Sequence, residues 1–195
     1  IRTVGPEHVT QLGAITADAF RHDPFNNWLF TQQKRKHQMF TTLAKYIYAP
    51  NGFCQILSED GEDLAATMWM LPGGSMATPI AASLSLAATF LLDSGWTGMK
   101  NGFATGDAME KHHPKEPHVY LFTVGVIGAG RGRGLGRRLI EPMLDACDRT
   151  GTMAYLENSN PANTRVYNSL GFESIGMIEP VVGCPPLEAM KRVAR

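Results

Sequence analysis

The first part of the chain alternates between helical and strand-like spacing of its apolar side chains. Residues 6–20 and 33–49 carry apolar positions every three or four residues, which predicts two amphipathic helices, and Arg2–Val4 is a short candidate strand before them. Residues 54–57 and 64–71 are largely apolar and are joined by a short polar turn, which is typical of a β-hairpin. This part therefore predicts one strand, two helices and a hairpin.

The second part predicts a longer alternation of helices and strands. Residues 78–112 have Ala, Leu and Met at helical density with interrupting glycines, so two helices are expected there. Val119–Val126 is nearly all apolar, which indicates a central strand buried on both faces, and residues 135–149 form an amphipathic pattern that ends before Gly151. The remaining predicted elements are a strand at 153–157, a short helix at 161–170, a strand at 172–179 and a last strand at 187–192. The alternation predicts a single α/β domain over residues 1–195 with a sheet of mixed direction.

Charge and cysteine content narrow the classes of partner. The chain has 18 basic and 18 acidic residues, so no overall field attracts nucleic acid or an anionic membrane, and neither is expected as a partner. Cys54, Cys147 and Cys184 are odd in number and widely spaced, which favours neither a disulfide framework nor a zinc site and fits a cytoplasmic protein. The most apolar stretch, residues 80–92, is shorter than the roughly 18 residues of a membrane helix. No signal peptide and no metal-ligand motif are recognised, so no metal is expected.

A glycine- and arginine-rich turn between the central strand and the following helix carries the strongest chemical signal. Glycines let backbone N–H groups approach phosphate oxygens, the helix N-terminus adds about half a positive charge, and arginines complete the charge match. The turn therefore predicts a cradle for the diphosphate of a nucleotide-like ligand. The cradle residues are Arg131, Gly132, Arg133, Gly134, Leu135, Gly136 and Arg137.

The register of the glycines excludes two common diphosphate ligands. A dinucleotide fingerprint requires glycine at its first, third and sixth positions, and from Gly128, Gly130 or Gly132 the sixth position is arginine or leucine. The P-loop of nucleoside triphosphatases requires Gly-Lys-Ser/Thr, and no lysine occurs between Gly125 and Arg149. Neither a dinucleotide nor a nucleoside triphosphate is therefore the expected ligand.

The remaining pattern, Arg131-x-x-Gly134-x-Gly136, resembles the coenzyme A loop of the GNAT family of N-acetyltransferases. Members of that family carry a second motif, in which Asn is followed by Tyr seven residues later and then by Gly-Phe. The residues of this chain at those positions are Asn160, Tyr167, Gly171 and Phe172. Residues 113–117 and 123–126, together with Asn163, resemble the puromycin acetyltransferase branch, although many relatives have proline where this chain has Gly128.

The resemblance implies the GNAT fold, in which a mixed, mostly antiparallel sheet has helices on both faces and two central strands splay apart. It also implies acetyl-CoA as the donor, held by the cradle. In the family, the backbone before the cradle binds the pantetheine arm and polarises the thioester, and here that backbone is Val124, Gly125 and Val126, with Gly125 expected to permit a bulge. Asn160 and Asn163 are further expected coenzyme contacts.

Transfer of an acetyl group to an amine requires a proton donor for the departing thiolate. Tyr167 is the expected general acid and also a coenzyme contact. It lies two turns into a helix that Asn160 is expected to cap and that Pro161 begins. Cys147 lies within the helix after the cradle, which makes a covalent acyl-cysteine route unattractive, so direct attack in a ternary complex is expected.

The proton acceptor is left open between three alternatives. Glu157 ends a strand beside the central one and can reach the cleft between them. Tyr120 and His118 alternate with Val124 on one expected face of the central strand, so they can act directly or order a relay. A relay without a single base is the third alternative. His113, in the loop before Pro114, is expected to be solvated.

The acceptor amine is expected to meet the thioester from the side opposite the coenzyme, against the first helices and the hairpin. The candidate substrate residues are Phe20, Asp23, Trp28 and Trp69, and the pair Asp23-Pro24 is also expected to end the first helix. The resemblance implies a small-molecule primary amine, with antibiotic or toxin inactivation as one role. The alternatives are a non-catalytic acetyl-CoA sensor and an enzyme that acetylates protein or peptide amines. The chain is expected to be a monomer or a homodimer.

Overall fold

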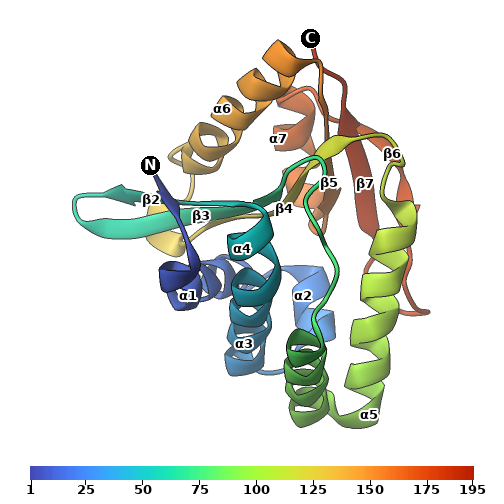
Figure 1. The fold of residues 1–195 in the computed structure, drawn as a ribbon. Helices are drawn as coiled ribbons and strands as arrows, with labels where there is room; N and C mark the ends of the chain where they lie inside the picture. Colours follow the sequence, from blue (N-terminus) through green and yellow to red (C-terminus); the bar gives the residue numbers. More distant parts are fainter.

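Seven strands form one continuous sheet in the computed structural model, which describes residues 1–195 (Figure 1). The strand order is β1-β2-β3-β4-β5-β7-β6, and every neighbouring pair is antiparallel except β4 and β5. The strands are β1 (Arg2–Val4), β2 (Phe53–Glu59), β3 (Glu62–Met70), β4 (His118–Val126), β5 (Met153–Asn158), β6 (Glu173–Ile178) and β7 (Leu187–Arg192). The predicted mixed, mostly antiparallel sheet is confirmed.

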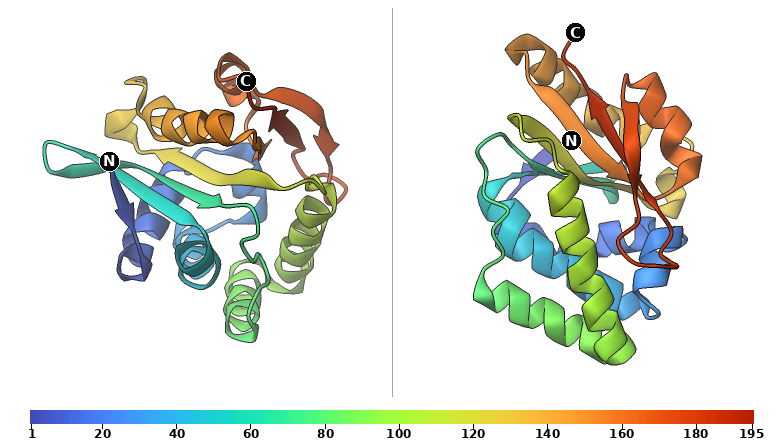
Figure 2. Two further views of the ribbon diagram at one scale, coloured as in Figure 1. Left: turned by 45° about the horizontal axis from the view of Figure 1, so that its top comes forward. Right: turned by 90° about the vertical axis from the view of Figure 1, so that its right-hand side faces the viewer.

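Helices cover both faces of the sheet (Figure 1, Figure 2). Helices α1 to α5 lie on one face, and α6 and α7 lie on the other. The helices are α1 (Val9–Ala19), α2 (Pro24–Leu29), α3 (Gln33–Leu43), α4 (Ala49–Asn51), α5 (Ile80–His112), α6 (Leu135–Thr150) and α7 (Thr164–Ser169), with short helical turns η1 (Pro6–His8), η2 (Ala44–Tyr48), η3 (Gly128–Gly130) and η4 (Pro161–Asn163). None of them combines the length and the apolar character that crossing a membrane requires.

Helix α5 consists of two arms that meet at a kink. Its backbone leaves helical geometry at Ser94 and Gly95, and φ is 66° at Gly95, a value that glycine adopts without steric cost. The two helices predicted for residues 78–112 are therefore present as two arms of one element. The second arm, residues 96–112, leads directly towards β4 (Figure 1).

Helix α2 was missed by the sequence prediction, which treated Asp23-Pro24 only as the end of the first helix. Helix α1 ends at Ala19, and Asp23 caps α2 by accepting a hydrogen bond from the backbone N–H of Asn26 at 2.8 Å. Pro24 is the first residue of α2, where a missing N–H has no cost. A helix of six residues is too short to leave a periodic apolar pattern.

Strands β4 and β5 are paired over only part of their length. Their register runs from His118 opposite Met153 to Leu121 opposite Leu156. Beyond these residues β4 continues to pair with β3, and β5 continues to pair with β7. The two central strands therefore diverge at their C-terminal ends, as the GNAT resemblance implied, and this divergence positions the site.

A β-bulge in β4 changes which of its side chains share a face. The register with β3 pairs Leu121 and Thr123 with consecutive residues, so Phe122 is the extra residue. As a result Tyr120 packs in the core under α1 to α3, whereas Val124 packs in the core beneath α6. The prediction that Tyr120 and Val124 share a face is therefore wrong, because it assumed uninterrupted alternation.

Gly125, where a bulge was expected, pairs regularly with Ala66. Its lack of a side chain has another use: a Cβ built on Gly125 would lie 2.7 Å from the Cβ of Ala19 in α1. Gly125 therefore allows the end of α1 to approach β4 closely. The expectation of a bulge at this residue is corrected, because the bulge lies at Phe122.

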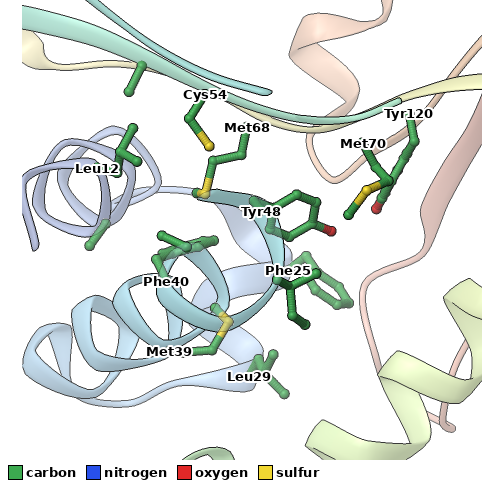
Figure 3. Packing of buried hydrophobic residues seen from close by; sticks show 14 of the residues in the cluster. Leu12, Phe25, Leu29, Met39, Phe40, Tyr48, Cys54, Met68, Met70 and Tyr120 are labelled. Atoms are coloured by element: carbon green, nitrogen blue, oxygen red, sulfur yellow. The ribbon is translucent and has the colours of Figure 1, made fainter. Parts of the chain in front are cut away.

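The larger core lies between the sheet and helices α1 to α3 (Figure 3). Leu12 of α1, Phe40 of α3 and Met68 of β3 belong to it and are fully shielded from solvent or nearly so. The rings of Tyr48 and Phe122 stack with their centroids 4.4 Å apart. Aromatic side chains thus extend this core to the place where β4 leaves β5.

Candidate active site

A cavity of about 450 Å³ opens where β4 and β5 diverge. Helices α2, α3 and α5 close its opposite side. Residues that line it from the two strands and from the segment after β5 include Thr123, Val124, Leu156, Glu157, Asn163 and Tyr167. The gap between the strands and the space under the helices are therefore one continuous cavity.

The predicted cradle lies between η3 and α6 and has an open outer side. Gly132 and Gly134 have φ values of 75° and 74°, which glycine adopts readily, and a Cβ on either residue would contact nothing within 4 Å. Helix α6 begins at Leu135 and no side chain caps its first turn. The first backbone N–H groups of a helix have no intrahelical partner, so they are available to an anion. The backbone of the cradle therefore fits a diphosphate.

The first turn of α6 lies directly beside the end of β4. A Cβ on Gly136 would lie 3.6 Å from the side chain of Val126 and 3.7 Å from that of Val124. The predicted pantetheine backbone and the predicted phosphate cradle are thus adjacent in space. One extended ligand can contact both.

The arginines of the cradle bond to the protein itself. Arg131 donates hydrogen bonds to the backbone carbonyl oxygens of Val126 at 3.3 Å and Ala19 at 2.7 Å, so it ties α1 to the end of β4. Arg133 pairs with Glu59 of β2, and Arg137 donates to Ser169 of α7 at 2.6 Å. Arg138 also pairs with Glu59, and Arg137 pairs with Glu141. The four arginines of this region therefore form ion pairs with only two carboxylates, which leaves this end of the molecule electropositive.

The segment after β5 places its predicted residues differently. Asn160 caps η4, because its side-chain oxygen accepts a hydrogen bond from the N–H of Ala162 at 3.1 Å. Asn163 and Tyr167 line the cavity, whereas Asn160 does not. The helix cap predicted for Asn160 is confirmed, and its contact with a coenzyme stays a prediction.

Tyr167 is held against a rigid neighbour at the edge of the cavity. Its ring meets the buried ring of Phe172 edge to face, with centroids 6.1 Å apart. Burial raises the pKa of the Tyr167 phenol, and the carboxylate of Asp23 raises it further. The phenol therefore keeps its proton throughout the physiological pH range, as a proton donor must.

Asp23, a predicted substrate residue, is used by the protein to join two elements. Its carboxylate caps α2, accepts a hydrogen bond from the side chain of Asn26 at 2.8 Å and accepts another from Ser159 at 2.7 Å. Asp23 is only 6% exposed and does not line the cavity. It therefore fixes the end of β5 against α2.

Glu157 lies at the inner end of the cavity beside a histidine that the sequence prediction placed in solvent. The Glu157 side chain is 2% exposed, and one of its oxygens, Oε1, lies 3.3 Å from Nε2 of His113. His113 is itself only 12% exposed at its side chain and lines the cavity, and its ring meets that of Tyr120 edge to face, with ring centroids 4.4 Å apart. The expectation that His113 is solvated is therefore wrong, because α5 directs its last turn over β4.

A chain of contacts leads from Glu157 towards the surface. Nδ1 of His113 lies 3.3 Å from Nε2 of His118, and Nδ1 of His118 lies 2.8 Å from the backbone oxygen of Glu116. A carbonyl oxygen only accepts, so Nδ1 of His118 carries a hydrogen and its Nε2 accepts from His113. Oε1 of Glu157 is buried and makes no hydrogen bond within the protein, so it is available to accept one from a bound ligand.

Tyr120 is a poor base in this setting. Burial raises the pKa of its phenol well above the usual value, and the carboxylate of Glu157 and the phenol of Tyr48 raise it further. Tyr120 is therefore neutral at physiological pH. Among the alternatives left open by the sequence, the geometry favours Glu157 with its histidine partners.

Like Asp23, two more of the predicted substrate residues lie away from the cavity. Trp69 is completely buried in the core on the α6 face of the sheet, and Trp28 packs against Phe25 with ring centroids 6.4 Å apart. Phe20 does line the cavity. The hairpin was expected to contribute Trp69, but alternation along β3 turns that side chain to the other face.

The second arm of α5 forms the wall that the sequence prediction missed. Its residues Gly102, Thr105 and Gly106 line the cavity together with more polar neighbours. A signal was present in the sequence, since small residues recur at helical spacing on one face of this arm and leave space beside it. That signal alone does not say which element the face meets.

Comparison with known proteins is consistent with this geometry. The profile of the family described as Acetyltransferase (GNAT) family matches residues 17–172. An uncharacterized N-acetyltransferase of Schizosaccharomyces pombe is 29% identical over 173 residues, which are 82% of this chain and 68% of that protein. The N-alpha-acetyltransferase RimI of Mycobacterium tuberculosis is 37% identical over 78 residues, 39% of this chain and 47% of its own length.

A solved structure from Corynebacterium glutamicum, described as histone acetyltransferase HPA2 and related acetyltransferase, has a similar fold. Its TM-score is 0.74 at 21% sequence identity, and the match covers 100% of this chain and 95% of that one. At this identity the likeness concerns the fold, including the arrangement of helices on both faces of the sheet.

Proposed function

The chain belongs to the GNAT family of acetyltransferases, and from that premise we propose that it transfers an acetyl group from acetyl-CoA to the primary amine of a small molecule. The observation that carries the proposal is the continuous cavity between the diverging strands and the helical wall, with Tyr167 and Glu157 both on its lining. Acetyltransferases of this family use acetyl-CoA, which supplies a thioester carbonyl as the acetyl donor when bound. The transfer proceeds by direct attack of the amine in a ternary complex.

The chain offers a continuous surface for the coenzyme. The backbone N–H groups of the cradle, from Arg131 to Arg137, suit the diphosphate, because the loop is open on its outer side and α6 has no side-chain cap. The backbone of Val124 to Val126 suits the pantetheine arm, since β4 has no partner strand on its β5 side there. Asn163 lines the same cavity on the segment after β5, and Asn160, which caps η4, is a further proposed contact.

Proton transfers are assigned to groups whose positions support them. Tyr167 holds a proton at its phenol oxygen and donates it to the leaving sulfur. Glu157 accepts the proton that the amine nitrogen loses. A proton arriving at Glu157 can move to Nε2 of His113, while Nδ1 of His113 releases its own proton to Nε2 of His118.

Protein or peptide amines are a second candidate class of acceptor, favoured by the similarity to RimI. The two classes require different sites. A peptide must continue out of the site in an extended form, whereas residues of α2, α3 and α5 line the side of this cavity that faces away from the strands. A helical wall on that side favours a small molecule. The resemblance of residues 113–117 to the puromycin acetyltransferase branch gains weight from the place of His113 at the cavity, and with it a role in inactivating an amine antibiotic or toxin.

The test is incubation of the protein with acetyl-CoA and either a panel of small amines or a pool of peptides, read by release of free thiol and by mass spectrometry of the products. Acetylated small amines are the expected result. Products found only among the peptides would reverse the choice of acceptor. Thiol release that is independent of any acceptor, together with tight binding of acetyl-CoA, would favour the sensor.

The base assignment is tested with Glu157→Gln and His113→Gln. Removing a general base lowers turnover by about 10²-fold to 10⁴-fold, and because the two groups act together the double variant should lose little more than Glu157→Gln alone. Matched controls are Glu173→Gln and His22→Gln, which change the same residue types at exposed positions. Full activity in both site variants would remove the pair from the mechanism.

A further inference from the structure

The acceptor end of the cavity has a chemical character of its own. None of the residues that line the cavity is Lys or Arg, although the chain contains 18 of them, and three lining residues are carboxylates. These are Glu157, deep in the cavity, and Asp107 and Glu110 on α5. A site with this lining attracts a cation and repels an anion.

Asp107 and Glu110 are carboxylates of the lining that remain in contact with solvent, so we place the entrance of the cavity beside them. Both are exposed, and their spacing of three residues places them on one face of the second arm of α5. A molecule that enters past this arm meets two negative charges before it reaches the apolar interior. An ammonium group is favoured there, and a carboxylate on the same molecule is not.

The interior is apolar and aromatic. Phe25, Phe40 and Phe90 are buried residues whose side chains line it, and Phe103 lies edge-on to Phe90 with ring centroids 6.3 Å apart. A volume of about 450 Å³ must also hold the reacting end of the donor, since the lining reaches Thr123 and the diverging strands. The space that remains suits a compact apolar body rather than an oligosaccharide or a peptide.

Two buried hydroxyl groups in the lining have no partner within the protein. Thr105 of α5 and Thr123 of β4 are each 4% exposed, and neither Oγ1 atom makes a hydrogen bond. Buried polar groups are nearly always paired, so these two point to a ligand that completes them. They lie on opposite walls, one on the helical arm and one at the divergence of the strands.

We infer that the acceptor is a compact apolar primary amine, with an aromatic or branched body, an ammonium group and no carboxylate, and that Asp107 and Glu110 select it at the entrance. This inference rests on the proposed function. The reactive nitrogen of the acceptor meets Glu157, its body lies among the phenylalanine rings, and the second arm of α5 determines which bodies fit.

The test uses pairs of compounds that differ only by a carboxylate: phenethylamine against phenylalanine, and tyramine against tyrosine. Spermidine and a short peptide with a free N-terminus complete the set. Because an anion must be desolvated in an apolar, acidic cavity, kcat/KM for each amine should exceed that of its amino acid by at least about 100-fold. Spermidine and the peptide should be acetylated poorly.

The role of the entrance is tested with Asp107→Asn/Glu110→Gln. An exposed charge changes binding affinity by up to about fivefold, so the double variant should raise KM for the amines several-fold without changing KM for acetyl-CoA. The ratio of kcat/KM between each amine and its amino acid should become smaller. Asp145→Asn/Glu173→Gln removes the same formal charge at exposed positions outside the cavity and should leave both constants unchanged.

Failure of the inference and failure of the proposed function give different results. Equal turnover of amines and amino acids, or a preference for spermidine or peptide, would overturn the acceptor class while acetyl transfer stands. Absence of product with every acceptor would overturn the proposed function. Calorimetric titration of phenethylamine and phenylalanine without acetyl-CoA then tests the pocket directly, and equal affinities would overturn the inference.

Discussion

The close approach of α1 to β4 at Gly125 can be tested by adding a single methyl group. A Cβ on Gly125 would lie 2.7 Å from the Cβ of Ala19 and 3.5 Å from the Cα of Thr16. Carbon atoms pack best at about 3.5–4.0 Å, so Gly125→Ala requires α1 and β4 to separate by about 1 Å. Neither partner is a flexible side chain, so the backbone itself must move.

That movement has an energetic and a functional consequence. Overpacking of this kind costs about 1–3 kcal/mol, and in a domain of this size each kcal/mol lowers the melting temperature by about 2–4 °C. The guanidinium of Arg131 bonds to the carbonyl oxygens of Ala19 and Val126, so the same displacement strains the link between α1 and the cradle. We therefore expect Gly125→Ala to lower both stability and kcat/KM.

The assay is a double-mutant cycle with Ala19→Gly, measured by denaturant unfolding and by acetyl transfer. Ala19→Gly removes the opposing methyl group at a cost of up to about 1 kcal/mol, because glycine is a poor helix former. In the double variant the two substitutions should compensate with a coupling energy of about 1–2 kcal/mol, and activity should recover. Gly106→Ala is the control for the unfolding measurement alone, since a Cβ there meets nothing within 4 Å and should stabilise the helix. Strictly additive effects at Gly125 and Ala19 would refute the close-approach argument.

Three further predictions concern individual side chains. Tyr167→Phe should lower kcat by about 10²-fold or more while calorimetry finds the affinity for acetyl-CoA nearly unchanged, and unaltered turnover would remove its role as acid. Burial raises the pKa of Cys54 to about 12 and that of Cys184 to about 11, so a thiol reagent at pH 8 should label the native protein far more slowly than the denatured one, and rapid native labelling would contradict their burial. Hydrogen bonding to Arg192 lowers the pKa of Asp148 to about 2, so its stabilising effect is complete above the unfolded pKa of about 3.9 and is lost as pH falls through 2. The melting temperature of Asp148→Asn should accordingly lie below that of the wild type at pH 7 and approach it at pH 2, and a constant difference would count against the pair.

The cradle and the order of elements were predictable because their signals are local. Glycine at positions 132 and 134 indicates the positive φ angle that the backbone adopts there. The apolar run of Val119–Val126 indicates that this strand is buried. The cap at Asn160 and the helix that follows it depend on neighbours within a few residues. Such features depend only on residues that are close in sequence, so they do not change with the arrangement of the rest of the chain.

The face of each residue along β4 was not predictable in the same way. A single extra residue at Phe122 reverses the alternation, so Tyr120 and Val124 end on opposite faces. The local sequence pattern does not predict the bulge, because the bulge is a property of the pairing between β3 and β4. The wrong prediction for Trp69 has a similar cause, since the pairing of β3 with β4 also decides which face of the sheet the Trp69 side chain occupies.

The amino-acid sequence by itself determined the family, the mixed α/β architecture and the loop proposed to hold the coenzyme. Only the tertiary structure decided that His113 meets Glu157, 44 positions later, and that the second arm of α5 rather than the hairpin closes the cavity. The physical reason is that local backbone preferences act between near neighbours, whereas these contacts follow from how two distant segments bury their apolar faces against one sheet.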